Sequence, residues 1–230
     1  MNPPSLSIVV LGATGAVGGY AARALAATPA VAKLSLLGRR AVEGVAGSAV
    51  AQHVVDVFAP ASYAPLLPGH DIAVCTLGIG EPSKSSKAEL VRVDRDAVLD
   101  FARACKDAGV RHFELLSAVG ANSASASFYL RTKGELEDGL KALNFQRLSL
   151  FQPSAILTPT NRYGVSQGLL LAAMPLLKPL LQGGLKKYRG IDVQQLGLAM
   201  ARNVLAAKSG VETLHWAEIT ALAALAAPTV

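Results

Sequence analysis

The run Gly12-Ala13-Thr14-Gly15-Ala16-Val17-Gly18 constrains the fold more than any other feature of the chain. It follows an apolar, strand-like segment, Leu6–Leu11, and precedes a helix-like segment, Ala16–Ala27. Glycine allows a sharp turn and a close approach of a phosphate because it has no Cβ, and the start of a helix offers unpaired N–H groups to an anion. This order predicts a site for a dinucleotide pyrophosphate, although the spacing is G-x-x-G-x-x-G and not the general G-x-G-x-x-G. The alternative is a plain glycine turn between a strand and a helix.

The rest of the chain up to Gln152 alternates short apolar runs with longer helical patterns. Strands are expected at Ser7–Leu11, Ala32–Leu37, Val50–Val55, Asp71–Leu77, Arg111–Leu116 and Phe145–Phe151. Helices are expected at Ala16–Ala27, Glu89–Ala108 and Phe128–Leu143, with a short one at Pro60–Leu67. Such alternation predicts parallel βαβ units with right-handed crossovers. The fold class is therefore α/β, a doubly wound parallel sheet of the Rossmann type.

Beyond Gln152, prolines and glycines break the chain into shorter pieces. Helices are expected at Gln167–Leu181 and Val193–Ala207, a late strand at Glu212–Trp216 and a last short helix from Ala217. The simplest organisation is one domain over residues 1–230, with a cofactor-binding core over about 1–151 and a C-terminal, substrate-covering segment over 152–230. Ligands of such sheets bind beyond the carboxyl ends of the strands, so functional residues should directly follow strands.

Composition excludes several other classes of protein. The apolar fraction of 51% and the charged fraction of 17% indicate a globular chain. The net charge of +6 comes without a long basic block, so nucleic-acid binding is not expected. The two cysteines, Cys75 and Cys105, are expected to be buried thiols in a reducing compartment. The four histidines are scattered, so no metal is expected.

The location expected from the sequence is cytoplasmic. The first residues lack the basic region and apolar core of a signal peptide. The longest apolar stretch, Gly168–Leu181, is interrupted by Pro175, Lys178 and Pro179 and is too short to span a bilayer. We expect it to be a kinked helix covering a core. The alternative is a peripheral membrane contact, with the cations of the segment 186–189 just beyond it.

Residues after the second, third and fourth expected strands indicate which cofactor binds. Arg39 and Arg40 stand where dinucleotide folds that read an unphosphorylated ribose place an acid. A guanidinium fork matches phosphate oxygens, so the pair predicts a preference for NADP(H) over NAD(H), the alternative being two solvated arginines. Asp56 is a candidate partner of the adenine amine. Thr76 and Gly78 end the fourth strand and are expected to approach the cofactor, although Gly78 also suits a simple strand end.

The candidate chemistry lies after the fifth strand, in Tyr129-Leu130-Arg131-Thr132-Lys133. Tyr129 and Lys133 are four residues apart and share one helix face. A tyrosine with a reference pKa of about 10 is a poor acid–base group near neutral pH, and an adjacent ammonium lowers that pKa. The pair can then exchange a proton with a carbonyl or alcohol oxygen. Ser117 ends the fifth strand and is expected to donate to that oxygen. Gly134 is costly within a helix and indicates close packing there.

Together these features resemble the short-chain dehydrogenase/reductase superfamily. The stretches 75–78, 91–96, 113–117 and 129–134 are similar to one atypical branch, the Tat-interacting-protein-like NAD(P)H-binding oxidoreductases. The resemblance implies that Tyr129 is the acid/base, that Lys133 also holds the nicotinamide ribose, and that Ser117 orients the substrate. It implies pyrophosphate contacts from Gly12, Thr14, Gly15, Val17 and Gly18, and 2′-phosphate contacts from Arg39 and Arg40. Ala16, Leu77 and Pro153 complete the expected set of cofactor-binding positions.

Two departures from the superfamily pattern stand out. Many members use an Asn on the helix after the fourth strand in a proton relay, and no Asn occurs between Ser85 and Ala108. Gln152 precedes Pro153 where relatives often have Arg.

Three functions follow from the sequence. The first is an NAD(P)H-dependent oxidoreductase acting on a small carbonyl or alcohol. The second is an NADPH-binding regulator or scaffold without turnover. The third is a sugar-nucleotide epimerase, which usually has a longer substrate region. Four residues are candidates to line a substrate pocket or to belong to the core: Tyr163, Leu169, Met174 and Tyr188.

Overall fold

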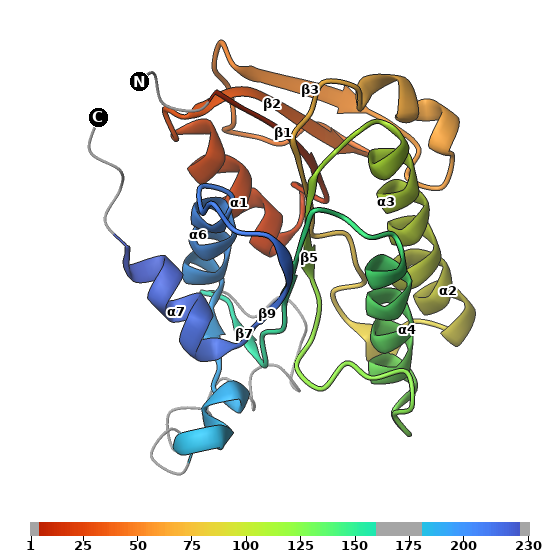
Figure 1. Ribbon diagram of the computed structural model, residues 1–230. Coiled ribbons are helices and arrows are strands. Elements are labelled where there is room, and N and C mark those ends of the chain that lie inside the picture. Colours follow the sequence, from red (N-terminus) through yellow and green to blue (C-terminus); the bar gives the residue numbers. More distant parts are fainter. Residues whose placement is uncertain (1–4, 160–180, 226–230) are drawn as a thin grey trace.

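A computed structural model describes residues 5–159 and 181–225 of the chain, which form a parallel sheet between two layers of helices (Figure 1). The seven-stranded sheet has the order β3-β2-β1-β4-β5-β6-β9. Its strands are β1 (Leu6–Leu11), β2 (Val31–Gly38), β3 (Val50–Val54), β4 (Ile72–Cys75), β5 (His112–Leu116), β6 (Arg147–Phe151) and β9 (Gly210–Leu214). All six pairings are parallel. The strand order reverses between β1 and β4, which confirms the doubly wound sheet.

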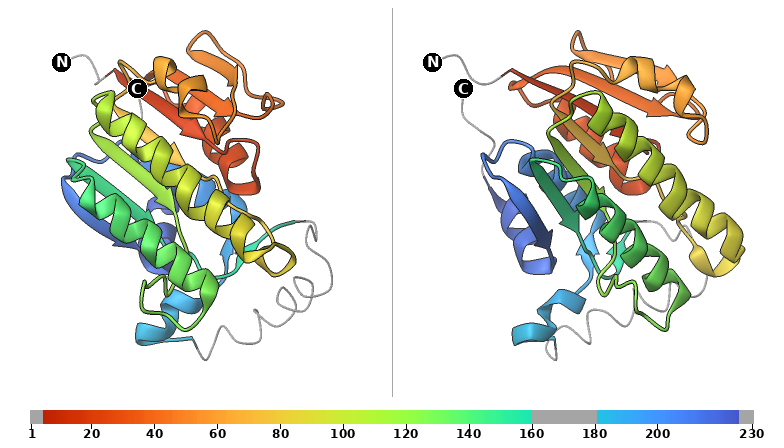
Figure 2. Two further views of the ribbon diagram at one scale, coloured as in Figure 1. Left: turned by 90° about the vertical axis from the view of Figure 1, so that its right-hand side faces the viewer. Right: turned by 45° about the vertical axis from the view of Figure 1, so that its right-hand side comes forward.

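Helices cover both faces of the sheet, as the two views of Figure 2 show. One layer contains α1 (Ala16–Ala26), α6 (Val193–Asn203) and α7 (Trp216–Ala224). The other contains α2 (Lys87–Val91), α3 (Ala97–Asp107) and α4 (Phe128–Ala142). Side chains of β1 alternate between the layers: Ile8 and Val10 belong to one buried cluster, Val9 and Leu11 to the other. This explains why a strand without polar alternation suits a sheet that is covered twice.

Two of the expected helices differ in detail. The helix predicted over Glu89–Ala108 starts at Lys87, where the Ser86 hydroxyl accepts the N–H of Glu89, and is interrupted by a π-helix over Arg92–Asp96 before α3 begins. The predicted helix over Pro60–Leu67 is two short 3₁₀ turns, Pro60–Ser62 and Ala64–Leu66. Proline at the start of each turn suits a helix beginning.

The C-terminal part contributes to the main sheet. β9 is its seventh strand, two residues earlier than the expected Glu212–Trp216, and α6 packs along α1 through Leu196 and Ala199. A small parallel pair, β7 (Ile156–Leu157) with β8 (Ile191–Asp192), was not expected from the sequence. A 3₁₀ helix, η5 (Gly183–Tyr188), precedes β8. The expected helix over Gln167–Leu181 and the candidate membrane contact lie, apart from Leu181, outside the described residues.

Two further expectations concern cysteines and membrane spans. Cys75 on β4 and Cys105 on α3 are free and buried, as predicted. Burial raises the pKa of the Cys75 thiol to about 12, so this side chain acts as a small apolar group. No helix within residues 5–159 and 181–225 is long and apolar enough to cross a membrane.

Candidate functional site

The glycine run forms a tight loop between β1 and α1. Gly12 has φ +94°, the left-handed region that favours glycine. A Cβ added to Gly12 would lie 2.6 Å from the backbone nitrogen of Leu77, and one added to Gly18 would lie 2.3 Å from the carbonyl oxygen of Gly12. The Thr76 hydroxyl donates to the Gly12 carbonyl at 3.0 Å. The loop is therefore held against the end of β4 at contacts that only glycine permits.

The N-terminus of α1 fits a dinucleotide pyrophosphate. Gly15 is its N-cap, no side chain caps its first N–H groups, and its first turn holds no acid. Thr14 and Gly15 are exposed beside these N–H groups. Uncapped donors and the positive end of the helix dipole attract an anion, and the glycines leave room for it. This observation favours the phosphate site over a plain glycine turn.

The other predicted cofactor residues lie around this loop. Arg39 and Arg40 follow β2, the neighbour of β1, and both are exposed. Asp56 follows the edge strand β3 and is exposed, and its carboxylate accepts the N–H of Phe58 at 2.9 Å. Pro153 is buried after β6, where its carbonyl accepts the N–H of Val119. These four residues are not among those that line the cavity described next.

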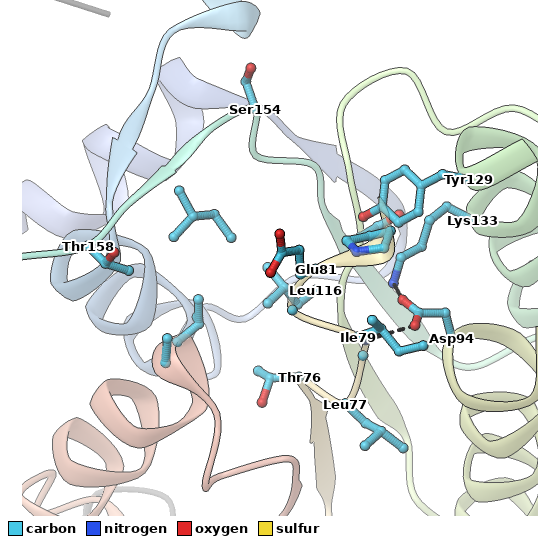
Figure 3. A pocket seen from close by; sticks show the side chains of 17 residues that line it. Thr76, Leu77, Ile79, Glu81, Asp94, Leu116, Tyr129, Lys133, Ser154 and Thr158 are labelled. Atoms are coloured by element: carbon cyan, nitrogen blue, oxygen red, sulfur yellow. Dashed lines mark hydrogen bonds and ion pairs between the residues drawn. The ribbon is translucent and has the colours of Figure 1, made fainter. Parts of the chain in front are cut away.

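A cavity of about 420 Å³ opens where β1, β4 and β5 end (Figure 3). All three predicted catalytic residues line it: Ser117, Tyr129 and Lys133. Ala16 and Val17 of α1 and the predicted Thr76, Leu77 and Gly78 also line it. The remaining lining residues are Ile79, Gly80, Glu81, Pro82, Asp94, Leu116, Ser154, Ile156 and Thr158.

A buried ion pair that the sequence analysis missed holds the lysine. Lys133 Nζ lies 2.8 Å from Asp94 Oδ1, with side chains only 4% and 1% exposed, respectively. The other Asp94 oxygen accepts the N–H of Ile79 at 2.8 Å, and both contacts are drawn in Figure 3. Asp94 belongs to the π-helix, a form that is frequent at functional sites. One signal in the sequence could have revealed this ion pair: the helix that lacks the superfamily's Asn carries a charged residue, Asp94.

The ion pair changes the expected electrostatics of Tyr129. Burial raises the pKa of Tyr129, Lys133 lowers it and Asp94 raises it, so the net pKa lies above the ordinary value. The expectation of a net lowering by Lys133 is therefore wrong for this arrangement. Burial lowers the pKa of Lys133, but Tyr129 and Asp94 raise it to a net value above the ordinary one. Near neutral pH the site accordingly holds a neutral phenol beside an ammonium.

Ser117 lines the cavity, but its hydroxyl bonds elsewhere. Its Oγ donates to Glu137 Oε1 at 2.5 Å. Gln152 Nε2 donates to both oxygens of the same buried carboxylate, at 2.8 and 3.1 Å. The single O–H of Ser117 is thus directed to a carboxylate on α4 and not to the cavity. Neither Glu137 nor this role of Gln152 was predicted.

Gly134 has the close neighbour that its position in a helix predicted. A Cβ there would lie 2.1 Å from the backbone carbon of Asn122, in the loop that precedes α4. Glycine therefore lets this loop cross α4 next to Lys133.

None of the four candidates for the substrate pocket is found among the described residues that line the cavity. Tyr163, Leu169 and Met174 lie outside the described residues. Tyr188 is on η5, 40% exposed, and does not line the cavity. Within residues 5–159 and 181–225, no three His, Cys, Asp or Glu side chains are grouped closely enough to hold a metal ion.

Comparison with known proteins relates the chain to NAD(P)H-binding proteins. The model of the NAD(P)H-binding family matches residues 12–149. The rat (Rattus norvegicus) protein HTATIP2 is 40% identical over 153 residues, covering 66% of this chain and 63% of the rat protein. The chain thus matches less than two thirds of that relative's length. The protein named fmp52, mitochondrial, of Emericella nidulans is 31% identical over 155 residues, covering 65% of this chain and 66% of that protein.

Solved structures share the fold at low sequence identity. UDP-glucuronic acid 4-epimerase from Bacillus cereus, in complex with NAD, has a TM-score of 0.69 and 13% identity, and the match covers 91% of this chain and 77% of that one. MoeE5, in complex with UDP-glucuronic acid and NAD, has a TM-score of 0.69 and 15% identity, covering 90% and 75%. At this identity the likeness shows the fold alone. The family model and the similarity to HTATIP2 identify the chain as a member of the NAD(P)H-binding family, among the atypical short-chain dehydrogenase/reductases.

Proposed function

We propose that this protein is an NADP(H)-dependent oxidoreductase that acts on a small carbonyl or alcohol, with Tyr129 as the acid/base. One observation carries the proposal: Tyr129 and Lys133 line the same cavity as the first residues of α1, whose glycine loop fits a pyrophosphate. A bound nicotinamide would supply or accept the hydride. The chain's own residues would handle the proton.

The raised pKa of Tyr129 favours one direction of proton transfer. A phenol that stays protonated near neutral pH donates to a carbonyl oxygen more readily than it accepts a proton from an alcohol. The Lys133 ammonium stabilises the phenolate that remains, and Asp94 holds that ammonium at 2.8 Å. Reduction of a carbonyl is therefore the proposed direction.

Arg39 and Arg40 support the proposed preference for NADP(H). They are exposed at the carboxyl end of the strand beside the glycine loop, where a 2′-phosphate would need cationic donors. Asp56 is proposed to meet the adenine. Pro153 is proposed to support the cofactor through the loop that its carbonyl holds.

The direct test is NADPH oxidation with a panel of aldehydes, ketones and quinones. Wild-type protein should oxidise NADPH in the presence of at least one of these classes, and the Tyr129→Phe variant should not. Equal rates in both proteins would remove Tyr129 from the mechanism.

A second candidate is an NADPH-binding protein without turnover. The hydrogen bond from Ser117 to Glu137 favours it, because the serine then offers no proton to a substrate oxygen. This candidate predicts NADPH binding with no turnover across the whole panel.

Cytoplasmic location stays a prediction, since the name of the fungal relative places that protein in mitochondria.

A further inference from the structure

Glu81 brings a carboxylate into the substrate side of the cavity. It follows β4 through the loop over residues 78–80, and its side chain is 19% exposed. Figure 3 shows its carboxylate among the side chains that line the cavity. Its ion-pair partner, Lys84, lies 2.9 Å away but is 70% exposed and is not a lining residue. Water around Lys84 weakens that pair, so the carboxylate keeps its influence inside the cavity.

Within the described lining, no cation pairs with this carboxylate, since Lys84 lies outside the lining. The charged members are Glu81, Asp94 and Lys133. Lys133 is already neutralised by Asp94 at 2.8 Å, and both are buried. No other lysine or arginine belongs to the lining that the structure describes. An anionic group of a substrate would therefore meet a like charge without a cation to hold it.

The rest of this side of the cavity is apolar with a few hydroxyl groups. Ile79, Pro82, Leu116 and Ile156 supply the apolar wall. Ser154 and Thr158 add hydroxyl groups on the strand side (Figure 3). The cavity of about 420 Å³ would be shared with the nicotinamide, so the remaining space suits a small molecule. Such a wall with one carboxylate suits a compact apolar compound that carries a hydrogen-bond donor or a positive charge.

We propose that Glu81 determines substrate specificity: the cavity accepts neutral and cationic carbonyl compounds and rejects anionic ones. The inference rests on the proposed function, since it names the substrate class of the same cavity. Glu81 takes no part in the transfer of hydride or proton. It sets which molecules reach Tyr129.

A turnover experiment compares aldehydes of similar shape and different charge. The probes are 4-carboxybenzaldehyde, 4-isopropylbenzaldehyde and 4-(trimethylammonio)benzaldehyde, reduced with NADPH by wild type, Glu81→Gln and the control Glu89→Gln, which changes an exposed acid outside the lining. In wild type and Glu89→Gln, kcat/KM should be highest for the cationic aldehyde, lower for the neutral one and lowest for the anionic one. Glu81→Gln should lower the ratio of cationic to anionic kcat/KM about tenfold, a change of about 1.4 kcal/mol. Intrinsic reactivity cancels because ratios are compared between proteins.

A binding experiment separates this inference from the proposed function. Benzamidine, benzamide and benzoate are cationic, neutral and anionic probes of one shape, and their Kd values for the protein–NADPH complex need no turnover. We expect benzamidine to have the lowest Kd and benzoate the highest. The ratio of the benzoate Kd to the benzamidine Kd should be about tenfold smaller in Glu81→Gln. If the three probes bind in this order and no compound of the panel is reduced, the role of Glu81 is supported and the reductase is rejected. Turnover with an unchanged charge preference in Glu81→Gln would retain the reductase and overturn the role of Glu81.

Discussion

Glu114 makes the stability of the fold depend on pH in a way that one substitution can isolate. It lies on β5 and is fully buried. Asn203 Nδ2 donates to its Oε1 at 2.7 Å, while its Oε2 has no hydrogen-bond partner. Burial raises the pKa of Glu114 to about 8, against the opposing effects of Asn203 and Arg147. The folded protein therefore holds a proton here that the unfolded chain releases.

The sign and size follow from the two pKa values. Between the ordinary value of 4.5 and about 8, the folded protein binds the proton and the unfolded chain does not, so the free energy of unfolding falls as the pH rises. His112 opposes this at lower pH, because burial lowers its pKa from 6.5 to about 3 and only the unfolded chain gains that proton. The opposition from His112 is half gone at pH 6.5 and fades above it. The slope for Glu114 is about 1.4 kcal/mol per pH unit and falls to half at its folded pKa, so its contribution lost from pH 6.5 to 8 is about 1.6 kcal/mol.

Glu114→Gln should remove this loss, since the amide mimics the protonated acid and can still accept from Asn203. Denaturation by urea at pH 6.5, 7.2 and 8, followed by fluorescence of the single tryptophan, Trp216, measures the free energy of unfolding. Between pH 6.5 and 8, the free energy of unfolding of the variant should rise by about 1.6 kcal/mol relative to that of wild type. Glu43→Gln, at an exposed acid, should show a constant difference. A constant difference for Glu114→Gln as well would falsify the assignment of the buried proton.

Four further outcomes test the site. Tyr129→Phe should abolish carbonyl reduction and leave the Kd for NADPH nearly unchanged, so loss of binding would mean that the tyrosine holds the cofactor. The double variant Arg39→Ala/Arg40→Ala should bind NADPH at least tenfold more weakly, a loss of about 1.4 kcal/mol. Calorimetric titration with NADH should show little change. An equal loss of affinity for NADPH and NADH would contradict the 2′-phosphate role. Gly15→Val should prevent NADPH binding without lowering the melting temperature much, because Gly15 is exposed at the start of α1 and the new side chain would occupy phosphate space; normal binding would place the pyrophosphate elsewhere. Asp94→Asn should lower the pKa of Tyr129, since it leaves the Lys133 charge without its partner. Ultraviolet titration of phenolate, with Asp94→Asn/Tyr129→Phe as the reference, measures this, and an unchanged titration would exclude the coupling.

The sequence predicted those parts of the structure that leave a periodic or local pattern. The alternation of apolar runs and helical patterns was enough for the sheet, because each β1 side chain from Ile8 to Leu11 enters one of two buried clusters. Tyr129 and Lys133 were predicted as a pair because a spacing of four fixes their common face. β7 and β8 are two residues long each, too short to leave a pattern.

Contacts between distant side chains were harder to foresee. The pair of Asp94 with Lys133 joins two helices, and nothing local in either helix specifies its partner. The bond from Ser117 to Glu137 was missed for a related reason: Glu137 is an ordinary acid in a helical pattern until the fold buries it beside Gln152. The net pKa of Tyr129 depended on such a contact, so its direction could not be predicted from the spacing of Tyr129 and Lys133 alone.

The π-helix over Arg92–Asp96 makes the length of this segment a constraint in its own right. Leu90 on α2 and Val98 on α3 are buried, and Asp94, between them in the π-helix, faces Lys133. Deleting a single residue there would turn one half of the segment by about 100° relative to the other. Either the apolar anchors or the carboxylate would then point the wrong way. The contact of Asp94 with Lys133 therefore depends on the number of residues in this segment as well as on the identity of its side chains.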